Sequence, residues 1–193
     1  RRLVPIQDDA AGVKRIRIEL AQVLVKAGQK NEAAEQGKRA FDIEPHTVDD
    51  LEKIEEIFRG AGAAMEGVRA AEARAALLGQ GSPAEAIPAW LAVADLWRGQ
   101  KRNDLAAQSL EKVLELEPAH RAAFDQLRDL HAAGGNWRAW ARVSDVFAPN
   151  IADPEEKLAL LKEVAKVHEQ RLGQKEMAFI AWTRALSDAP ADD

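Results

Sequence analysis

The chain of 193 residues contains no cysteine and no tyrosine, and it has only four serines and two threonines. The absence of cysteine excludes disulfide bonds, thiolate catalysis and cysteine-bound zinc. The few hydroxyl groups offer little for nucleophilic catalysis, and no serine stands in a G-x-S-x-G sequence. A chain without cysteine suits a reducing or an oxidising compartment equally, so the sequence leaves the localisation unknown.

Excess positive charge and long apolar runs are also missing. The 27 lysines and arginines face 32 aspartates and glutamates, which gives a formal net charge of -5. No run approaches the roughly 18 apolar residues that a membrane-spanning helix needs. We therefore expect no nucleic-acid partner, because that needs a basic surface, and no insertion into a membrane.

The histidines are scattered and predict no metal site. His46, His120, His131 and His168 do not pair at helical spacing, whereas metal ligands must converge. Adjacent carboxylates such as Glu55 and Glu56 are interpreted as parts of a solvated helix face. We expect no catalytic site, no metal and no cofactor, and hence no enzymatic activity.

What the chain has in abundance is alanine. It contains 38 alanines but only 23 valines, isoleucines and threonines together, a balance that favours helices over strands. No segment alternates with the period of two that a strand requires. Apolar periodicity predicts ten helices, over residues 13–27, 30–43, 48–59, 63–78, 84–99, 103–116, 120–133, 136–147, 155–171 and 175–187.

The prolines show that these helices repeat. Pro45, Pro118 and Pro190 each follow an amphipathic run, where proline stops a helix. Ser82–Pro83 and Asp153–Pro154 each combine an N-cap residue with proline at the first helical position. These signals predict five helix–turn–helix units, over residues 13–45, 46–81, 82–118, 119–152 and 153–190.

Pairs of units form a longer period, because residues 46–118 match residues 119–190. Val93 then corresponds to Val164, Ala106 to Ala178 and Gly62 to Gly135. Residues 13–45 correspond to the second half of such a long period. We expect the chain to be a single domain over residues 1–193 and part of a longer array.

One unit carries a resemblance to a known family. Its residues Trp90, Val93, Ala94, Trp97, Ala106, Leu110, Val113 and Pro118 follow the spacing of the tetratricopeptide repeat (TPR). The first unit keeps Leu20, Ala21, Leu24, Ala33, Ala40 and Pro45, and the last keeps Ala178, Trp182, Ala185 and Pro190. The chain thus resembles divergent, double-repeat TPR arrays of large bacterial proteins. The resemblance implies an all-α, right-handed α-solenoid of about five repeats.

Three residues depart from the TPR pattern. Gly67 and Arg74 stand where small and apolar residues are expected, and Trp140 stands at a position for a small residue. We expect Trp90, Trp97, Trp140 and Trp182 to be core residues. Trp137 either packs against the start of its helix or protrudes as an anchor for a partner.

The resemblance further implies a function and a binding surface. In TPR arrays the first helix of each pair lines a groove that holds a peptide or a partner helix. The register places these candidate partner-binding residues on that surface: Asp49, Glu52, Glu56, Leu91, Asp95, Arg98, Asp125, Gln126 and Asp129, with Trp137 as a further candidate. Since most charged members are acidic, the predicted partner is a protein or peptide with basic groups.

The main prediction is a non-enzymatic scaffold or adaptor for protein–protein interaction. Two alternatives stay open at this point. One is a regulatory or substrate-presenting helical domain of a larger enzyme, and the other is an RNA-associated helical repeat protein.

Overall fold

A computed structural model describes residues 9–187 of the chain, so the stop signal predicted at Pro190 lies outside the described residues. The described part forms ten α-helices and one short 3-10 turn, without a strand. Two compact units divide the chain after Lys101. Each unit is described by itself.

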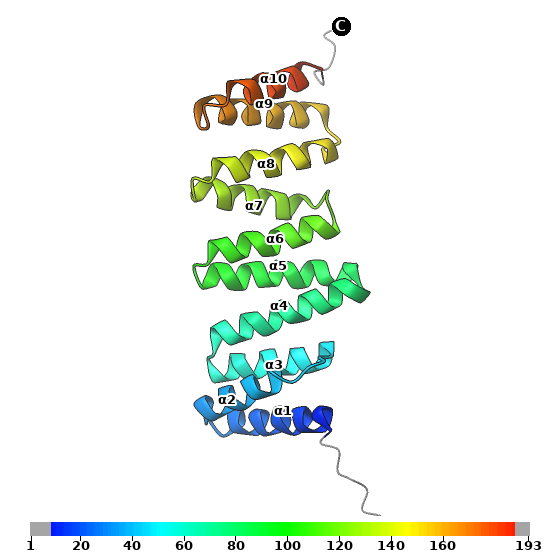
Figure 1. Ribbon diagram of the computed structural model, residues 1–193, viewed down its shortest axis with the longest axis vertical. Helices are drawn as coiled ribbons and strands as arrows, with labels where there is room; N and C mark the ends of the chain where they lie inside the picture. Colours follow the sequence, from blue (N-terminus) through cyan, green and yellow to red (C-terminus); the bar gives the residue numbers. More distant parts are fainter. Residues whose placement is uncertain (1–8, 188–193) are drawn as a thin grey trace, which may run out of the picture. The chain divides into compact units, whose positions relative to one another are not determined.

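Unit 1 contains the first five helices, coloured blue to green in Figure 1. The bounds are α1 (Ala10–Lys26), α2 (Lys30–Phe41), α3 (Val48–Ala61), α4 (Ala64–Gly81) and α5 (Pro83–Gly99). Helices α1 and α2 form one antiparallel hairpin, α3 and α4 form the next, and α5 packs against α4.

Unit 2 contains the other five helices and the short turn. The bounds are α6 (Asn103–Leu116), α7 (Arg121–Ala133), α8 (Trp137–Phe147), η1 (Ala148–Asn150), α9 (Pro154–Gln170) and α10 (Lys175–Ser187). Helices α7 and α8 form one hairpin, α9 and α10 form another, and α6 packs against α7. The fold is therefore an all-α helical repeat of the TPR-like, α-solenoid type, as the sequence predicts.

Side-chain caps begin most of the first helices of the hairpins. Thr47 and Asp50 form a reciprocal capping box at the start of α3, and Asp153 accepts a hydrogen bond from the Glu155 amide at the start of α9. Ser82 differs from the prediction, because its side chain accepts no capping hydrogen bond at the start of α5. Helix α5 nevertheless begins at Pro83 and continues through Pro88, at a position past the first turn.

The turns after α1, α3, α5, α7 and α9 each contain a residue with positive φ. Four of these residues are glycines, namely Gly28, Gly62, Gly135 and Gly173, and the fifth is Lys101 at φ 58°. Gly62 explains the preference for glycine at these turns. It ends α3 in the left-handed conformation, which residues with a Cβ atom adopt only at an energetic cost. The matching turns confirm that the repeat seen in the sequence is a repeat of structure.

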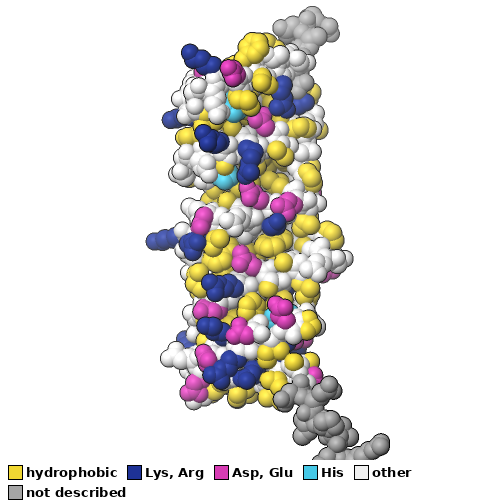
Figure 2. Space-filling view, viewed as in Figure 1, with side chains coloured by type: hydrophobic (Ala, Val, Ile, Leu, Met, Phe, Trp, Pro, Cys, Tyr) yellow, Lys and Arg dark blue, Asp and Glu magenta, His cyan; other side chains and the backbone are white. Residues whose placement is uncertain are grey.

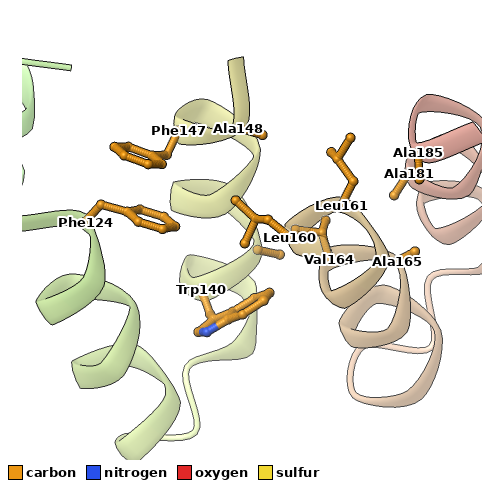
Figure 3. Close-up of a cluster of buried hydrophobic side chains, with 11 residues drawn as sticks. Phe124, Trp140, Phe147, Ala148, Leu160, Leu161, Val164, Ala165, Ala181 and Ala185 are labelled. Carbon is orange, nitrogen blue, oxygen red and sulfur yellow. The ribbon is translucent and has the colours of Figure 1, made fainter. Parts of the chain in front are cut away.

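The core of unit 1 lies between α1, α2, α3 and α4 and consists mostly of alanine and isoleucine side chains, with the single aromatic ring of Phe58 in this cluster. Helices α1 and α3 lie so close together at Gly60 that a Cβ atom on this residue would lie only 2.6 Å from Cγ1 of Val25. The core cluster of unit 2 contains three buried aromatic residues, Phe124, Trp140 and Phe147, beside aliphatic ones. Figure 3 shows α9 between α8 and α10, with Leu160, Leu161 and Val164 among the buried side chains.

Three of the five tryptophans contact this core of unit 2. Trp140 is buried, as expected, while Trp137 and Trp182 are half-buried and pack against the buried cluster. In unit 1, Trp97 is buried and its indole N–H donates to the Glu72 carboxylate at 2.7 Å. Trp90, also expected in the core, is half-buried, so Trp90 and Trp182 keep part of their surface exposed.

Candidate peptide-binding surface

A groove of about 670 Å³ lies between α1 and α3 in unit 1. Both helices are the first helices of their hairpins, which is the side where the TPR resemblance places a binding groove. Arg15, Glu19 and Gln22 line one wall, and Asp49 lines the other. The structure thus brings one of the candidate residues, Asp49, together with groove positions of the preceding repeat.

Buried Lys14 fixes the two walls of this groove. Its side chain is about 5% exposed, and its ammonium group lies 3.2 Å from the Asp50 carboxylate. Lys14 also donates a hydrogen bond to the backbone carbonyl of Pro45. A lysine buried to this degree requires such partners, and its two partners come from α3 and from the segment that precedes it.

The carboxylate of Asp50 is adapted to this role. Burial alone would raise its pKa, but hydrogen bonds from the backbone amide of Thr47 and from Lys14 outweigh that effect and lower the pKa below the ordinary value. Asp50 therefore carries its charge at neutral pH. The same side chain caps α3 and holds α1.

The groove contains more carboxylates than cations. Five carboxylates line it, from Asp9, Glu19, Glu44, Asp49 and Asp50, against three cations, from Lys14, Arg15 and Lys53. Each cation has an acidic partner, since Lys53 lies 2.6 Å from Asp49 and Arg15 lies 4.0 Å from Glu19. Among the described residues, Asp9 and Glu44 are left without a cation, and Asp9 caps α1.

The other candidate residues of unit 1 lie on α3 and α5. Glu52 and Glu56 are exposed on α3 and form no ion pair with any residue that the structure describes. Asp95 and Arg98 on α5 lie 3.2 Å apart as an exposed pair, and Leu91 is half-buried. Two of these carboxylates are therefore available to a partner without the loss of an internal ion pair.

The candidate residues of unit 2 lie mainly on α7. Asp125 is half-buried and lies 2.8 Å from Arg121, which also pairs with Glu156 of α9. Gln126 is half-buried, while Asp129 is exposed and forms no ion pair within residues 9–187. A small hollow of about 110 Å³ lies between α7 and α9, lined by Phe124, Arg128 and residues of α9.

Trp137 is the first residue of α8, the second helix of this hairpin, whereas the other candidate residues of unit 2 lie on the first helix, α7. Its ring packs against the buried cluster, and the guanidinium group of Arg171 lies 4.9 Å from the ring centroid. This geometry is typical of a cation–π contact. Trp137 is therefore packed at the first turn of its helix, with part of its side chain exposed.

Two features of the structure were not predicted from the sequence. Glu55, interpreted from the sequence as solvated, is buried between Arg59 at 2.8 Å and Arg74 at 3.0 Å. Arg74 departs from the TPR pattern, and this ion pair explains the departure. The sequence contained a signal for this ion pair, because Arg74 stands at a position where an apolar residue is expected and a glutamate, Glu55, lies on the preceding helix.

The second unpredicted feature is a hollow of about 410 Å³ in unit 2, lined by residues of α6, α7 and α8 that include His131. Burial lowers the pKa of His131, and nearby Arg142 lowers it further, against the opposing effect of Glu111. Glu111 and Arg142 form an ion pair at 3.0 Å at this hollow. His131 is thus held as the neutral form near pH 7.

Charges of both signs alternate over the surface. Figure 2 shows lysines and arginines interspersed with aspartates and glutamates on the face in view, without a continuous basic stripe there. No group of three histidine, aspartate or glutamate side chains that could hold a metal ion occurs within residues 9–187. None of the helices in this same part of the chain is long and apolar enough to cross a bilayer.

These helical hairpins and their grooves define the class of the protein, a TPR-like helical repeat protein. No protein-family model matches the sequence, and no curated protein matches it. Among solved structures, the chain is similar to the MamA protein, with 13% identity, a TM-score of 0.41 and 92% of each chain covered.

A second similar structure comes from Podosopora anserina, a putative kinesin light chain with nearly identical TPR-like repeats. It shares 18% identity at a TM-score of 0.42, with 90% of this chain and 93% of that chain covered. A mutant form of MamA gives 16% identity and a TM-score of 0.43, with coverage of 93% and 94%. The class assignment rests on the hairpins, caps and turns of the chain itself.

Proposed function

We propose that the chain is a non-enzymatic scaffold that binds a segment of a partner protein in the groove between α1 and α3. The observation that supports this most is the groove itself, which is about 670 Å³ in volume and lined by charged and apolar side chains of two first helices and of the segment before α3. A preformed concave surface of this size suits recognition of a peptide segment.

The rigidity of the groove supports the proposal. Lys14 joins α1 to Asp50 and Pro45, so the two walls keep their separation without a ligand. A binding site that is ordered before the partner arrives avoids part of the entropic cost of association. Charged side chains and apolar ones such as Ile18 and Pro45 both line the groove, so it suits a segment that carries charged groups together with apolar ones.

The charge of the groove indicates the chemistry of the partner. Glu44 is exposed and has no cation among the described residues, and Glu52 and Glu56 continue the acidic surface along α3. A lysine or arginine of the partner would gain a charge-assisted contact there without displacing an internal pair. The proposed partner is therefore a protein or peptide segment with basic groups.

The remaining candidate residues extend this proposal to the rest of the chain. Asp129 on α7 has the same features as Glu52 and Glu56, namely exposure and no ion pair within the described residues. Asp95, Arg98 and Asp125 would have to exchange an internal ion pair for one with the partner, so we assign them smaller contributions. Trp137 would contribute only the exposed part of its ring.

The proposal includes no chemistry by this chain. This non-enzymatic part of the proposal is supported by the lack of cysteine, the scarcity of hydroxyl side chains and the separation of the histidines along the sequence. No observation favours RNA binding, since the groove is acidic.

The test compares two short fluorescent peptides, one of alternating alanine and lysine and one of alternating alanine and glutamate. We expect the basic peptide to bind and the acidic one to fail, with affinity that falls as salt rises, because exposed charges are screened. Reversing one groove charge by Glu44→Lys should weaken binding of the basic peptide about tenfold.

The matched control reverses a charge outside the groove. Glu35 on α2 is exposed like Glu44, so Glu35→Lys changes the net charge equally without touching the groove. Equal losses for the two variants would reduce the effect to net charge and refute the groove as the site. Crosslinking of the chain in extracts, followed by mapping of the linked residues, then identifies the natural partner and reports whether it contacts α1 and α3.

A further inference from the structure

A pocket of about 170 Å³ lies at the turn between α3 and α4 in unit 1, and the end of α5 also lines it. Its walls are mostly apolar, with Phe58 from α3, Val68 from α4 and Leu96 from α5. Leu96 is 41% exposed, although its side chain is large and apolar. The end of α3 lines this pocket, whereas Asp49 at the start of α3 lines the groove beside α1. The pocket is therefore a separate feature of unit 1.

Gly67 leaves the space of this pocket open. It lies inside α4, where glycine is less favourable than alanine. Apart from the backbone of its own helix, a Cβ atom on Gly67 would meet one described atom within 4 Å, the Cβ atom of Phe58 at the ordinary contact distance of 3.5 Å. Packing therefore does not require glycine here, and the pocket has room for a side chain.

The internal repeat shows which residue stands at the same place in unit 2. Gly62 corresponds to Gly135, and both lie with positive φ in the turn after a first helix. The next helices, α4 and α8, both begin two residues after these glycines. Gly67 therefore corresponds to Trp140, so the smallest residue stands in one unit where the largest stands in the other.

In unit 2 the side chain of Trp140 fills this position. Trp140 is 6% exposed and belongs to the buried cluster, and Figure 3 shows its ring directed toward α9. Since Val93 corresponds to Val164, Leu96 corresponds to Val167, which packs against the same cluster. Unit 1 thus retains an apolar wall at this position but lacks the aromatic ring.

Other repeats of the array do not reach this pocket. Helix α3 already packs against α1 and α2, and α4 already packs against α5. In a solenoid each repeat contacts only its neighbours, and the neighbours here are in place. A group that enters the pocket therefore comes from outside the stack of hairpins.

The chemistry of the pocket favours an uncharged aromatic group. Glu55 lines the pocket, but one of its carboxylate oxygens pairs with Arg59 at 2.8 Å and the other with Arg74 at 3.0 Å. A lysine side chain would therefore find no unpaired carboxylate among the described residues of the lining. A ring could pack against Phe58 and lie beside the guanidinium group of Arg59. The volume is similar to that of an apolar cavity of about 150 Å³ that holds benzene.

We propose that this pocket binds an aromatic side chain of a partner protein, which takes the place that the ring of Trp140 takes in unit 2. The site is independent of the groove between α1 and α3 and of the basic groups proposed to bind there. Removal of Phe58, Val68 and Leu96 from water drives the contact. A single aromatic side chain held in a pocket is typical of the residues that contribute most to a protein interface.

The experiment titrates the isotope-labelled 193-residue chain with N-acetyltryptophanamide and follows its amide signals by NMR. We expect saturable shifts at Gly62, Gly67 and Leu96, with a Kd on the order of 1 mM for so small a probe. N-acetylalaninamide should cause no such shifts, because it lacks the ring. A pentapeptide with one tryptophan between glycines should bind at least as well as the single residue, because a partner segment has to present the ring.

Two variants of the pocket test the site, and a third is the control. Gly67→Trp supplies the ring from the chain itself and should weaken binding of the tryptophan probe at least about tenfold. Leu96→Gln changes an exposed wall, which the fold should tolerate, and should weaken binding about fivefold. Gly81→Trp is the matched control, because a Cβ atom there meets nothing within 4 Å among the described residues and Gly81 does not line the pocket. Binding in this control should be unchanged.

Four results would overturn the proposal. The first is the absence of saturable shifts with the tryptophan probe, and the second is a set of shifts centred on the groove between α1 and α3. The third is an equal loss of binding in Gly81→Trp. The fourth is binding of the single residue without binding of the pentapeptide, which would indicate a small molecule as the occupant. If circular dichroism shows that Gly67→Trp does not fold, Leu96→Gln decides the test, since unchanged binding there refutes the site and weaker binding supports it.

Discussion

The two units build the same kind of helix packing from different side chains. In unit 1, buried ion pairs join neighbouring helices, namely Lys14 with Asp50 and Glu55 with Arg74. In unit 2 the centre is aromatic, with the rings of Phe124 and Phe147 stacked at 3.9 Å between centroids. The repeat thus requires that side chains fill the space between neighbouring helices and that buried charges have partners. Either ion pairs or aromatic rings can meet this requirement.

This difference has consequences for stability. An aromatic core loses a large buried area when one ring is removed, whatever the pH. A buried ion pair depends on both partners and on their protonation, because one charge left alone in the interior is costly. Mutations in the two units should therefore differ in size, in pH dependence and in the way they can be rescued.

The largest effect is expected in unit 2 for Phe124→Ala. Loss of the stacked ring should lower the free energy of unfolding by about 3–5 kcal/mol, since the structure can close the cavity only in part. Hydrogen exchange measured by mass spectrometry should show the loss in α7, α8 and α9. Val146→Ala, at an exposed site, should change the stability by no more than about 0.5 kcal/mol. Equal losses from both changes would contradict the assignment of the aromatic core.

The next largest effect is expected in unit 1 for Glu55→Ala. It leaves Arg74, which is about a quarter exposed, without its buried partner, and should cost about 3 kcal/mol.

The double variant Glu55→Leu with Arg74→Leu sharpens this prediction. It replaces the pair by an apolar contact, with an apolar residue at position 74 as the TPR pattern expects, and should recover most of the loss. Chemical denaturation of the single and double variants measures the coupling. A double variant no more stable than Glu55→Ala would mean that the ion pair is required for packing.

The smallest effect concerns acid stability of unit 1. The folded structure lowers the pKa of Asp50, so its contribution is fully present above the ordinary value of about 3.9 and is lost as the pH falls through the lower folded value. Asp50→Asn should cost about 2 kcal/mol at neutral pH and should make unit 1 less dependent on pH in the acid range.

Hydrogen exchange at neutral and acid pH checks the acid prediction separately in each unit. Glu115→Gln in unit 2 is the control, because Glu115 forms an exposed pair with Lys112. An unchanged acid dependence of unit 1 in Asp50→Asn would show that other carboxylates control it.

The sequence determined the class of fold, the helices and their repeat. Alanine content, apolar periodicity, proline stops and the Asp153 cap act within a few residues of each other, so they can be recognised without knowing the rest of the chain. The observed helix bounds differ from the predicted ones by only a few residues.

The contacts between helices could not be predicted from the sequence and became known only from the tertiary structure. The sequence alone favours a solvated Glu55, because its partner on α4, Arg74, is 19 positions away in the chain. The burial of Lys14, the half-exposure of Trp90 and the pairing of Arg121 with Glu156 likewise depend on which helix lies opposite. Register identified the candidate groove positions, whereas the volume of the groove and the pairing of its charges came from packing. Burial and electrostatic energy depend on distances in space, and a repeat in the sequence determines only the order in which the helices meet.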